Sequence, residues 1–449
     1  MTKDMTKGSP MKLILGFALP LSLGLLFQQI YSLVDTIIVG KTLGVDALAA
    51  VGSTGSINFM VIGFCTGVCS GFAIPIAQRF GAEDYKSMRQ FIGNSAWLSA
   101  AFAVVMTLIT ALACRQILVL TRTPDNIIDM AYSYIFIIFL GIPATFLYNL
   151  CASIIRSIGD SKTPVIFLII ASVINIVLDL FLILKCGMGV AGAAYATVIS
   201  QAISGLLCLI YMRAKFEILH MSKEEWKLDK GHLGILMYMG VPMGLQYSIT
   251  AIGSVILQTS VNTLGSDCVA SVTAAGKLSM FVVCPLDAIG TTMTTYGGQN
   301  VGAKKLDRIG QGVKAANILA AIYAVFAFVL LYFASHVMLL LFVDASETQI
   351  IADARTFLLT TASTYFLLGL LENLRFLIQG MGFSGFAIFA GVAEMFARII
   401  VGLFLIPAFG FSAACFGSPL AWVFACAFLV PAYYHVMKKS RKMLGAVEI

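Results

Sequence analysis

Asp35 stands alone in an otherwise apolar stretch of the first half of the chain, where a carboxylate could do ion chemistry. It shares one face of a helix with Ser32 and Gln28, three and seven residues before it. Ionisable side chains inside apolar membrane segments are costly, and they usually mark ion or proton pathways. We therefore expect Asp35 to take up a cation or a proton. The alternative is that Asp35 caps or pairs near the external end of its helix.

Asn175 and Asp179 form a second polar group in an apolar stretch. They are four residues apart and so are neighbours on one helix face, and Ser172 extends the same stripe. Oxygen-rich side chains one turn apart can bind Na+ or share a proton, and Thr197 in the next helix could add a hydroxyl. In the alternative interpretation, Asn175 and Asp179 only form hydrogen bonds across a helix interface.

The second half of the chain carries a different set of charges. Glu394 and Arg398 are four residues apart, and we expect them to form a structural ion pair. Glu372 lies three residues before Arg375, so the same interpretation applies to it. For either acid, the alternative is a place in the functional site.

Some polar residues are candidates for a cavity lining rather than for ion binding. Asp287 follows Pro285, where a kinked helix would free backbone groups. The residues that we expect to line a cavity are Gln28, Ser32, Asp287 and Glu372.

The composition indicates which elements must position these residues. The chain has 449 residues, of which 59% are hydrophobic and 11% charged, and its mean hydropathy is +0.93; soluble proteins have about 25% charged residues. In lipid, each spanning segment must satisfy its own backbone, and a helix needs about 20 apolar residues to do so. We predict an all-α integral membrane protein with twelve transmembrane helices, near residues 11–38, 47–76, 91–112, 131–155, 163–185, 189–212, 233–262, 268–297, 313–334, 353–379, 383–406 and 411–437.

Basic residues predict the orientation of these helices. Twenty-one of the 29 Lys and Arg residues lie in one set of alternating connections, and five lie in the opposite set. Cytoplasmic loops hold the excess of basic residues, so we expect both termini to be cytoplasmic in a multi-pass protein of the cell membrane. This bias explains the net charge of +7 and removes the reason to invoke nucleic acid. The first apolar run is too long for a cleaved signal and is expected to be the first helix.

The sequence repeats itself after about 221 residues. Gln78-Arg79-Phe80-Gly81-Ala82 returns as Gln299-Asn300-Val301-Gly302-Ala303. An even number of helices per half makes the halves parallel repeats, with the substrate cavity expected at their interface near the midplane. We predict a six-helix lobe over residues 1–212, a cytoplasmic linker over 213–232 and a second six-helix lobe over 233–449. Asp35 and Asp179 have no charged counterpart in the second lobe.

Other chemistries have little support in the sequence. The ten cysteines lie mostly in apolar spans without metal-ligand spacing, and the four histidines are scattered. No nucleophile and base are found together. We expect no enzyme activity, cofactor or metal site beyond the coupling ion. We also expect a monomer whose partners are membrane lipid and small-molecule substrates.

The chain resembles the multidrug and toxic compound extrusion (MATE) family over essentially its whole length. The resemblance rests on the segment around Val34-Asp35-Thr36, the Gln299-to-Ala303 loop, the Gly159-to-Pro164 turn and the pair Asn175 and Asp179. Within the family the chain is most similar to the DinF-like branch. That similarity implies a cation site in the first lobe formed by Asp35, Asn175, Asp179 and Thr197, with Na+ able to bind at the first three.

The NorM-like branch of the same family has acids in the second lobe that this chain does not match well. No acid lies between Pro242 and Thr250, where that branch has a glutamate. Glu372 lies about two positions out of register with its aspartate in helix ten. The resemblance therefore leaves a second ion site open.

Together these features predict a secondary antiporter that exports organic cations or other amphipathic compounds in exchange for H+ or Na+ by alternating access. The alternative is a flippase for lipid-linked saccharides or lipids. Such a protein would need a cationic cavity, for which only Lys277, Arg375 and Arg398 are available inside the predicted helices. A membrane enzyme or a channel is a third possibility, without a motif to support it.

Overall fold

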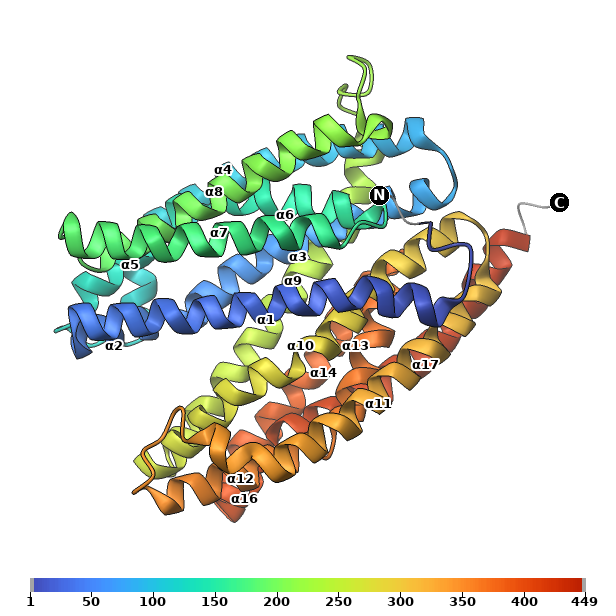
Figure 1. Cartoon of the computed structure of the whole chain (residues 1–449). Coiled ribbons are helices and arrows are strands. Elements are labelled where there is room, and N and C mark those ends of the chain that lie inside the picture. Colours follow the sequence, from blue (N-terminus) through green and yellow to red (C-terminus); the bar gives the residue numbers. More distant parts are fainter. Residues whose placement is uncertain (1–3, 446–449) are drawn as a thin grey trace. The chain divides into compact units, whose positions relative to one another are not determined.

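The computed structural model of the protein describes residues 4–445, which fold into long helices joined by short connections (Figure 1). Two compact units can be recognised from their internal contacts. The N-terminal unit contains Leu23–Gly244, and the C-terminal unit contains Met5–Ser22 together with the chain from Leu245 onward. The prediction of an all-α membrane protein is confirmed.

The helices of the first half of the chain begin with a helix of 34 residues. They are α1 (Pro10–Leu43), α2 (Val45–Ser53), α3 (Gly55–Gly81), α4 (Tyr85–Leu120), α5 (Ile128–Leu140), α6 (Ile142–Ser157), α7 (Lys162–Leu180) with the π-helical turn η1 (Phe181–Lys185), α8 (Val190–Lys215) and the short 3₁₀ turn η2 (Glu217–Leu219). Within the N-terminal unit, α6 packs against α3 and α8, and α7 packs against α8. Asp160 fixes the start of α7 because its carboxylate accepts hydrogen bonds from the backbone of Lys162 and Thr163.

The second half repeats this order. Its helices are α9 (Lys230–Asn262), α10 (Ser266–Gly302), α11 (Leu306–Leu339), α12 (Thr348–Ala362), α13 (Tyr365–Gly380), α14 (Gly385–Ile400) with the π-helical turn η3 (Val401–Leu405), α15 (Ile406–Phe409), α16 (Phe411–Cys415) and α17 (Gly417–Gly445). Helix α10 packs against α13, and α14 packs against α17.

Ten helices of the described chain are long and apolar enough to cross a membrane, and there are twelve spans if each of two bent pairs counts as one. The bent pairs are α5 with α6, at 46°, and α12 with α13, at 49°. They replace the continuous helices predicted over 131–155 and 353–379. At the first bend, Gly141 precedes Pro143, which has no N–H for the helix. At the second, the hydroxyls of Ser363 and Thr364 bond back to the helix carbonyls before them.

Two other predicted spans are also divided. The span predicted over 47–76 breaks at Thr54 into α2 and α3, and the span over 411–437 begins as the short α16 before α17. The hydroxyl of Thr54 donates to the carbonyl of Val51 at 2.7 Å, so a helix carbonyl is satisfied by a side chain at this break.

Helices α1 and α9 each contribute to both units. Helix α1 changes unit after Ser22, and α9 changes unit after Gly244. Both changes follow a proline inside the helix, Pro20 and Pro242, at equivalent places of the repeat. The units therefore differ from the predicted lobes of 1–212 and 233–449, because the start of each lobe's first helix packs with the other half of the chain.

The beginning of the chain is fastened to the C-terminal unit by the repeated motif found in the sequence. The backbone N–H of Met5 donates to Oε1 of Gln299 at 2.8 Å, and Asn300 donates to the carbonyl of Met5 at 3.3 Å. Arg308 donates to the carbonyl of Gly8 at 2.9 Å. These bonds explain why Met5–Ser22 belongs with the second half of the chain.

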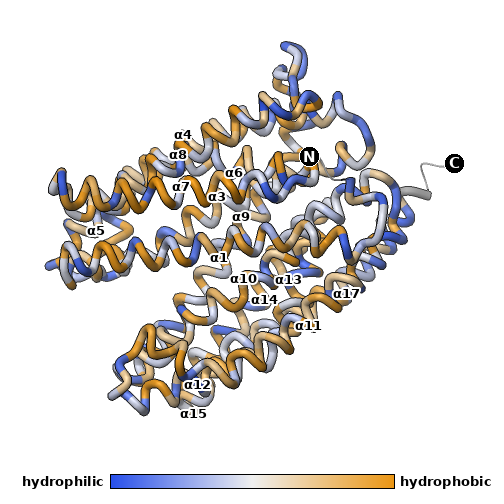
Figure 2. Tube along the Cα trace, in the orientation of Figure 1, coloured by the Kyte–Doolittle hydropathy of each residue, from blue (hydrophilic) through white to orange (hydrophobic). Residues whose placement is uncertain are grey.

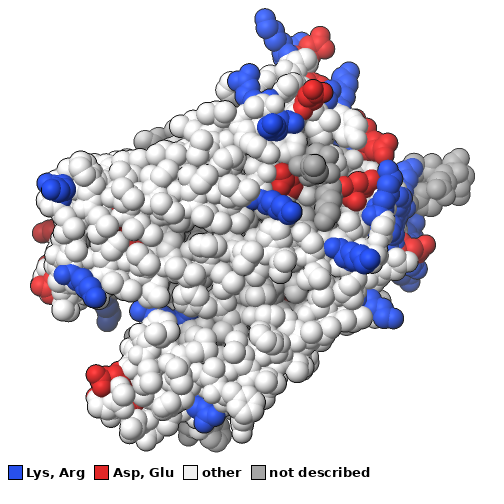
Figure 3. All heavy atoms as spheres, viewed as in Figure 1, with Lys and Arg blue, Asp and Glu red and all other residues white. Residues whose placement is uncertain are grey.

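The hydropathy of the helices agrees with a membrane environment. Long apolar stretches run along them (Figure 2), and the Lys, Arg, Asp and Glu side chains visible in Figure 3 gather mainly toward helix ends. Many large apolar residues in the middle of α4 and α11 are exposed, as expected where lipid is the solvent.

Candidate functional site

The N-terminal unit brings together the two aspartates that stand alone in the sequence. Asp35 on α1 and Asp179 on α7 are 144 residues apart in the chain, yet their carboxyl groups are within hydrogen-bonding contact. Both residues are buried, with exposed fractions of 8% and 0%. One oxygen of each, Oδ1, has no hydrogen-bond partner. Two ionised carboxylates in such contact repel each other, so a proton or a cation between them would relieve the repulsion.

Asn175 and Thr197 complete this group. In the orientation that satisfies both ends of its amide, Asn175 donates to Oδ2 of Asp179 at 2.9 Å and accepts from the backbone N–H of Thr197 at 3.1 Å. The hydroxyl of Thr197 donates to the carbonyl of Ala193 at 3.1 Å. The structure thus gathers Asp35, Asn175, Asp179 and Thr197, which come from α1, α7 and α8. We name these four residues the carboxyl-pair site.

Two tyrosines that the sequence reasoning missed lie beside this site. The hydroxyl of Tyr31 is in hydrogen-bonding contact with Thr197, and Tyr31 lies close enough to both aspartates to feel their charge. Tyr134 on α5 is buried near the same two carboxyl groups. Tyr31 is four residues before Asp35, so helical spacing could have pointed to it. Nothing in the sequence pattern could have pointed to Tyr134.

The remaining polar residues of the first half lie differently. Gln28 and Ser32 are exposed, although they share the helix face of Asp35. Ser172 is buried, and its hydroxyl donates to the carbonyl of Leu168 at 2.8 Å. Asp35 lies inside α1 and contacts another carboxyl group, so it does not cap its helix.

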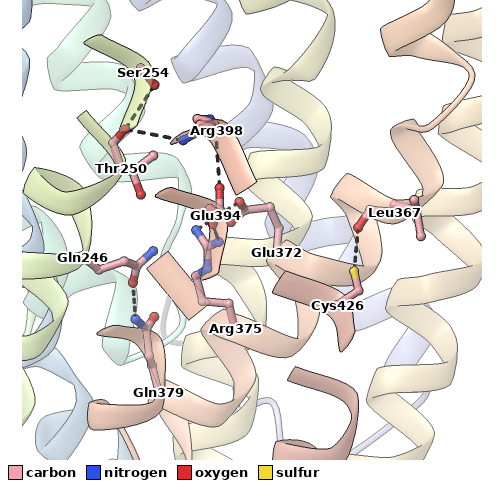
Figure 4. Close-up of polar contacts among 10 residues, drawn as sticks. All are labelled: Gln246, Thr250, Ser254, Leu367, Glu372, Arg375, Gln379, Glu394, Arg398 and Cys426. Atoms are coloured by element: carbon pink, nitrogen blue, oxygen red, sulfur yellow. Dashed lines mark hydrogen bonds and ion pairs between the residues drawn. The ribbon is translucent and has the colours of Figure 1, made fainter. Parts of the chain in front are cut away.

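The C-terminal unit holds a buried network of charged side chains instead (Figure 4). Arg398 lies 3.5 Å from Glu394 and Arg375 lies 3.6 Å from Glu372, as the spacings in the sequence suggest. The connection that the sequence did not predict joins α13 to α14: Arg375 donates to Oε1 of Glu394. Glu394 therefore contacts both arginines, and together with Glu372 it balances their two positive charges; all four side chains are buried or nearly so.

Polar groups of α9 surround this network. Arg398 donates to the carbonyl of Thr250 at 3.4 Å, and Gln379 donates to Oε1 of Gln246 at 2.6 Å (Figure 4). Nε of Arg375 and the hydroxyl of Thr250 have no partner. With its charges mostly paired across α13 and α14, the network is suited to holding helices together.

Asp287 and Lys277 lie on α10 in different surroundings. Asp287 is half-buried and close enough to Glu372 and Arg375 to feel their charges. Lys277 is exposed and lines a cleft with residues from the loop after α11. Among residues 4–445, no group of three or more His, Cys, Asp and Glu side chains is placed to hold a metal ion.

Comparison with known proteins identifies the class. Ten to twelve apolar helices in a repeated order define a multi-pass membrane protein. The MatE family model matches the chain twice, over residues 20–181 and 242–404. The chain therefore belongs to the MatE family, whose members are membrane transporters and not enzymes.

Similar proteins agree with this assignment. The chain is 32% identical to the "Probable multidrug resistance protein YoeA" of Bacillus subtilis (strain 168), over 88% of this chain and 86% of that protein. It is 26% identical to the "Multidrug export protein MepA" of Staphylococcus haemolyticus (strain JCSC1435), over 84% and 81%.

Solved structures share the fold. A crystal structure of MATE in complex with MaL6 has a TM-score of 0.90 at 22% identity, over 98% of this chain and 100% of that one. An outward-facing multidrug resistance MATE family transporter has a TM-score of 0.90 at 21% identity, over 98% and 99%.

Proposed function

We propose that this protein is a secondary antiporter that exports organic cations or other amphipathic compounds in exchange for H+ or Na+. The observation that carries the proposal is the contact between the buried carboxyl groups of Asp35 and Asp179, each with one unpartnered oxygen. The names of the relatives, which describe multidrug resistance and export, support the substrate class.

The carboxyl-pair site would act as the ion-loading element. A proton or Na+ between Asp35 and Asp179 replaces the repulsion of two buried charges by attraction, with Asn175 and Thr197 supplying further oxygen and N–H groups. The ion can drive export only if it binds more tightly in one state of the transporter than in the other. Because α1 and α7 each supply one carboxyl group, loading would change the packing of these two helices, which is the step that alternating access requires.

The network of the C-terminal unit has a supporting role in this proposal. Its two arginines are neutralised by Glu394 and Glu372 together, and Lys277 lies on a separate cleft. Of the three basic residues inside the predicted helices, Arg375 and Arg398 thus contact glutamates and Lys277 lies apart from them, which argues against the flippase alternative. We also propose that the protein is a monomer in the cell membrane. Both termini would lie in the cytoplasm, because most basic residues lie in one set of loops.

The test is transport of a fluorescent organic cation by the full-length protein in proteoliposomes. A pH gradient and a Na+ gradient are imposed separately, and liposomes without protein are the control. We expect one of the two gradients to drive accumulation against the concentration gradient of the dye. Equal dye movement with and without either gradient would contradict the proposal.

A further inference from the structure

The chain between α8 and α9 is held in a fixed place on α4. We call residues 216–229 the interlobe linker. Arg89 of α4 donates through Nε to Oε1 of Glu225 at 2.8 Å. Asn94 donates to the carbonyl of Lys227 at 3.2 Å and accepts from the N–H of Asp229 at 2.9 Å. A fully buried asparagine thus binds the linker through both ends of its amide.

The close fit of α4 and the linker depends on a glycine. A Cβ atom at Gly93 would lie 2.6 Å from the backbone oxygen of Glu225, which leaves no room for any other residue. The two hydrogen bonds from Asn94 and the close contact at Gly93 fix the linker backbone at Glu225, Lys227 and Asp229. The side chains that the linker exposes therefore point in fixed directions.

Helix α4 shows the level at which the linker meets the membrane. Trp97 is 52% exposed and begins a stripe of exposed apolar residues that continues through Val104 and Leu108. No charged residue occurs between Arg89 and Arg115. The 18 residues from Trp97 to Arg115 span about 27 Å of helix, close to the ~30 Å of a bilayer's hydrocarbon core. Trp97 therefore lies at one edge of the hydrocarbon, where tryptophan is enriched.

The linker places its own tryptophan beside Trp97. The indole N–H of Trp97 donates to the carbonyl of Trp226 at 3.1 Å. Trp226 is 42% exposed and Leu228 is 63% exposed, although both lie in a polar segment. Two tryptophans and a leucine are thus presented at the same edge of the membrane.

Basic side chains surround these apolar residues. Those exposed on the linker and next to it are Lys86, Lys223, Lys227 and Lys230. Two nearby acids are already paired: Glu225 with Arg89, and Asp229 with His232 at 2.6 Å. Burial works to raise the pKa of Glu225, but bonds from Ser222 and Arg89 outweigh it and lower that pKa, so this pair stays charged. The surface is left with more positive than negative charge, because residues 213–230 with Lys86 and Arg89 of α4 carry seven basic side chains, and the acids of 213–230 are four: Glu217, Glu224, Glu225 and Asp229.

We propose that the interlobe linker binds the headgroups of anionic phospholipids. Trp226 and Leu228 enter the boundary between headgroups and acyl chains, while Lys223 and Lys227 of the linker and the adjacent Lys230, at the start of α9, contact the lipid phosphates. Basic segments next to a membrane attract anionic lipid in this way. The linker is then a membrane-bound element of the transporter as well as a connection between its halves.

Tryptophan fluorescence can test the proposal, because the chain has only three tryptophans. In Trp97→Phe/Trp422→Phe, the single remaining Trp226 reports on the linker. The protein is placed in vesicles of phosphatidylglycerol and phosphatidylcholine, and the acyl chains of one lipid or the other are brominated at constant composition. We expect brominated phosphatidylglycerol to quench Trp226 about threefold more per molecule than brominated phosphatidylcholine.

A charge variant provides the matched comparison. Lys223→Gln/Lys227→Gln/Lys230→Gln should make the two brominated lipids quench equally, whereas Lys438→Gln/Lys439→Gln/Lys442→Gln on α17 should keep the preference. Size-exclusion profiles verify that each variant is folded. Equal quenching before any lysine is replaced would overturn the proposal, as would a preference that survives the linker substitutions. Quenching of Trp226 by aqueous iodide and by neither brominated lipid would also overturn it.

Discussion

The two carboxyl groups of the N-terminal unit, on Asp35 and Asp179, contact each other, whereas Glu394 and Glu372 of the C-terminal unit contact arginines. Glu394 faces two arginines and Glu372 faces one, so their charges are compensated by the protein itself. The polar groups found beside Asp35 and Asp179 in the described part of the chain are Asn175, Thr197, Tyr31 and Tyr134, and none of these supplies a positive charge. The compensating charge must come from outside, and this makes the pair suitable for coupling to an ion.

Asn175 should tune how tightly the pair holds its ion. Asn175→Leu removes the N–H that reaches Oδ2 of Asp179, a bond to a charged group that is worth about 1.5–3 kcal/mol. We expect the ion concentration for half-maximal transport to change by roughly 10- to 100-fold. Ser172→Ala is the matched control, because that hydroxyl bonds only to the carbonyl of Leu168. An unchanged ion dependence in Asn175→Leu would show that the amide has no part in ion binding.

The buried network should be needed for stability. Glu394→Gln leaves Arg375 and Arg398 buried without their shared partner, and breaking a buried pair costs about 3–5 kcal/mol. We expect a clearly lower Tm in a fluorescence unfolding assay. Replacing Glu394 and Arg398 together should also destabilise the protein, because Arg375 still loses one of its two carboxylate partners. Glu372→Gln should cost less, since its 3.6 Å contact involves one arginine. Equal losses from Glu394→Gln and Glu372→Gln would contradict this ranking.

Helical spacing predicted the residue neighbours that lie within one helix and missed those between helices. The pairs Glu394 with Arg398 and Glu372 with Arg375 follow from three- and four-residue spacing. The link from Arg375 to Glu394 joins two helices, and only the packing of α13 against α14 creates it. Tyr134 was missed for the same reason: it lies on α5 and Asp35 on α1, so helical spacing cannot connect them.

At the scale of elements, small residues decide which helices can approach closely. Gly67 and Gly71 on α3 are four residues apart, as are Gly240 and Gly244 on α9. A Cβ atom at Gly71 would lie 2.5 Å from the Cα atom of Gly240. This arrangement resembles the small-residue contacts by which membrane helices associate. It holds the first part of α9 in the N-terminal unit.

Replacing one of these glycines should separate the helices. Gly240→Ala would place a methyl group 2.4 Å from the ring of Phe72, so we expect a lower Tm and a smaller yield of monodisperse protein. Gly234→Ala on the same helix meets no atom within 4 Å and should be neutral or stabilising by up to ~1 kcal/mol. Equal changes in Tm for Gly240→Ala and Gly234→Ala would contradict the role of Gly240 in the close contact of α3 and α9.

The sequence predicted the number and order of the spans but not their breaks. Hydropathy measures how apolar a window is, and it remains high across Gly141 and across Ser363, where α5–α6 and α12–α13 bend. The positions of proline did not predict the breaks either, because α1 continues through Pro20 while the bend at Thr364 contains no proline.

At the scale of the whole molecule, each half of the chain is completed by a segment of the other. Met5–Ser22 packs with the second half, and the start of α9 up to Gly244 packs with the first. The repeated sequence did not reveal this exchange, because a repeat shows which segments are equivalent and not which ones pack together.

Two fragments should therefore fold only in each other's presence. We expect residues 1–222 and 223–449 to copurify when they are produced together, through a tag on one of them, and to aggregate when produced separately. The missing pieces, α9 up to Gly244 in one case and Met5–Ser22 in the other, contain buried residues such as Leu236 and Ile14. A fragment that is stable and monodisperse alone would contradict the exchange.

The most direct test of the central claim compares the unmodified protein with Asp35→Asn and Asp179→Asn in proteoliposomes. Each change replaces one member of the carboxyl pair by a neutral side chain of nearly the same size, so that the repulsion which an ion would relieve is gone. We predict that both variants insert and still exchange labelled substrate across the membrane, while efflux driven by the pH or Na+ gradient falls to the level of protein-free liposomes. Gradient-driven efflux at the unmodified rate in either variant would contradict the claim that this pair couples the ion to export.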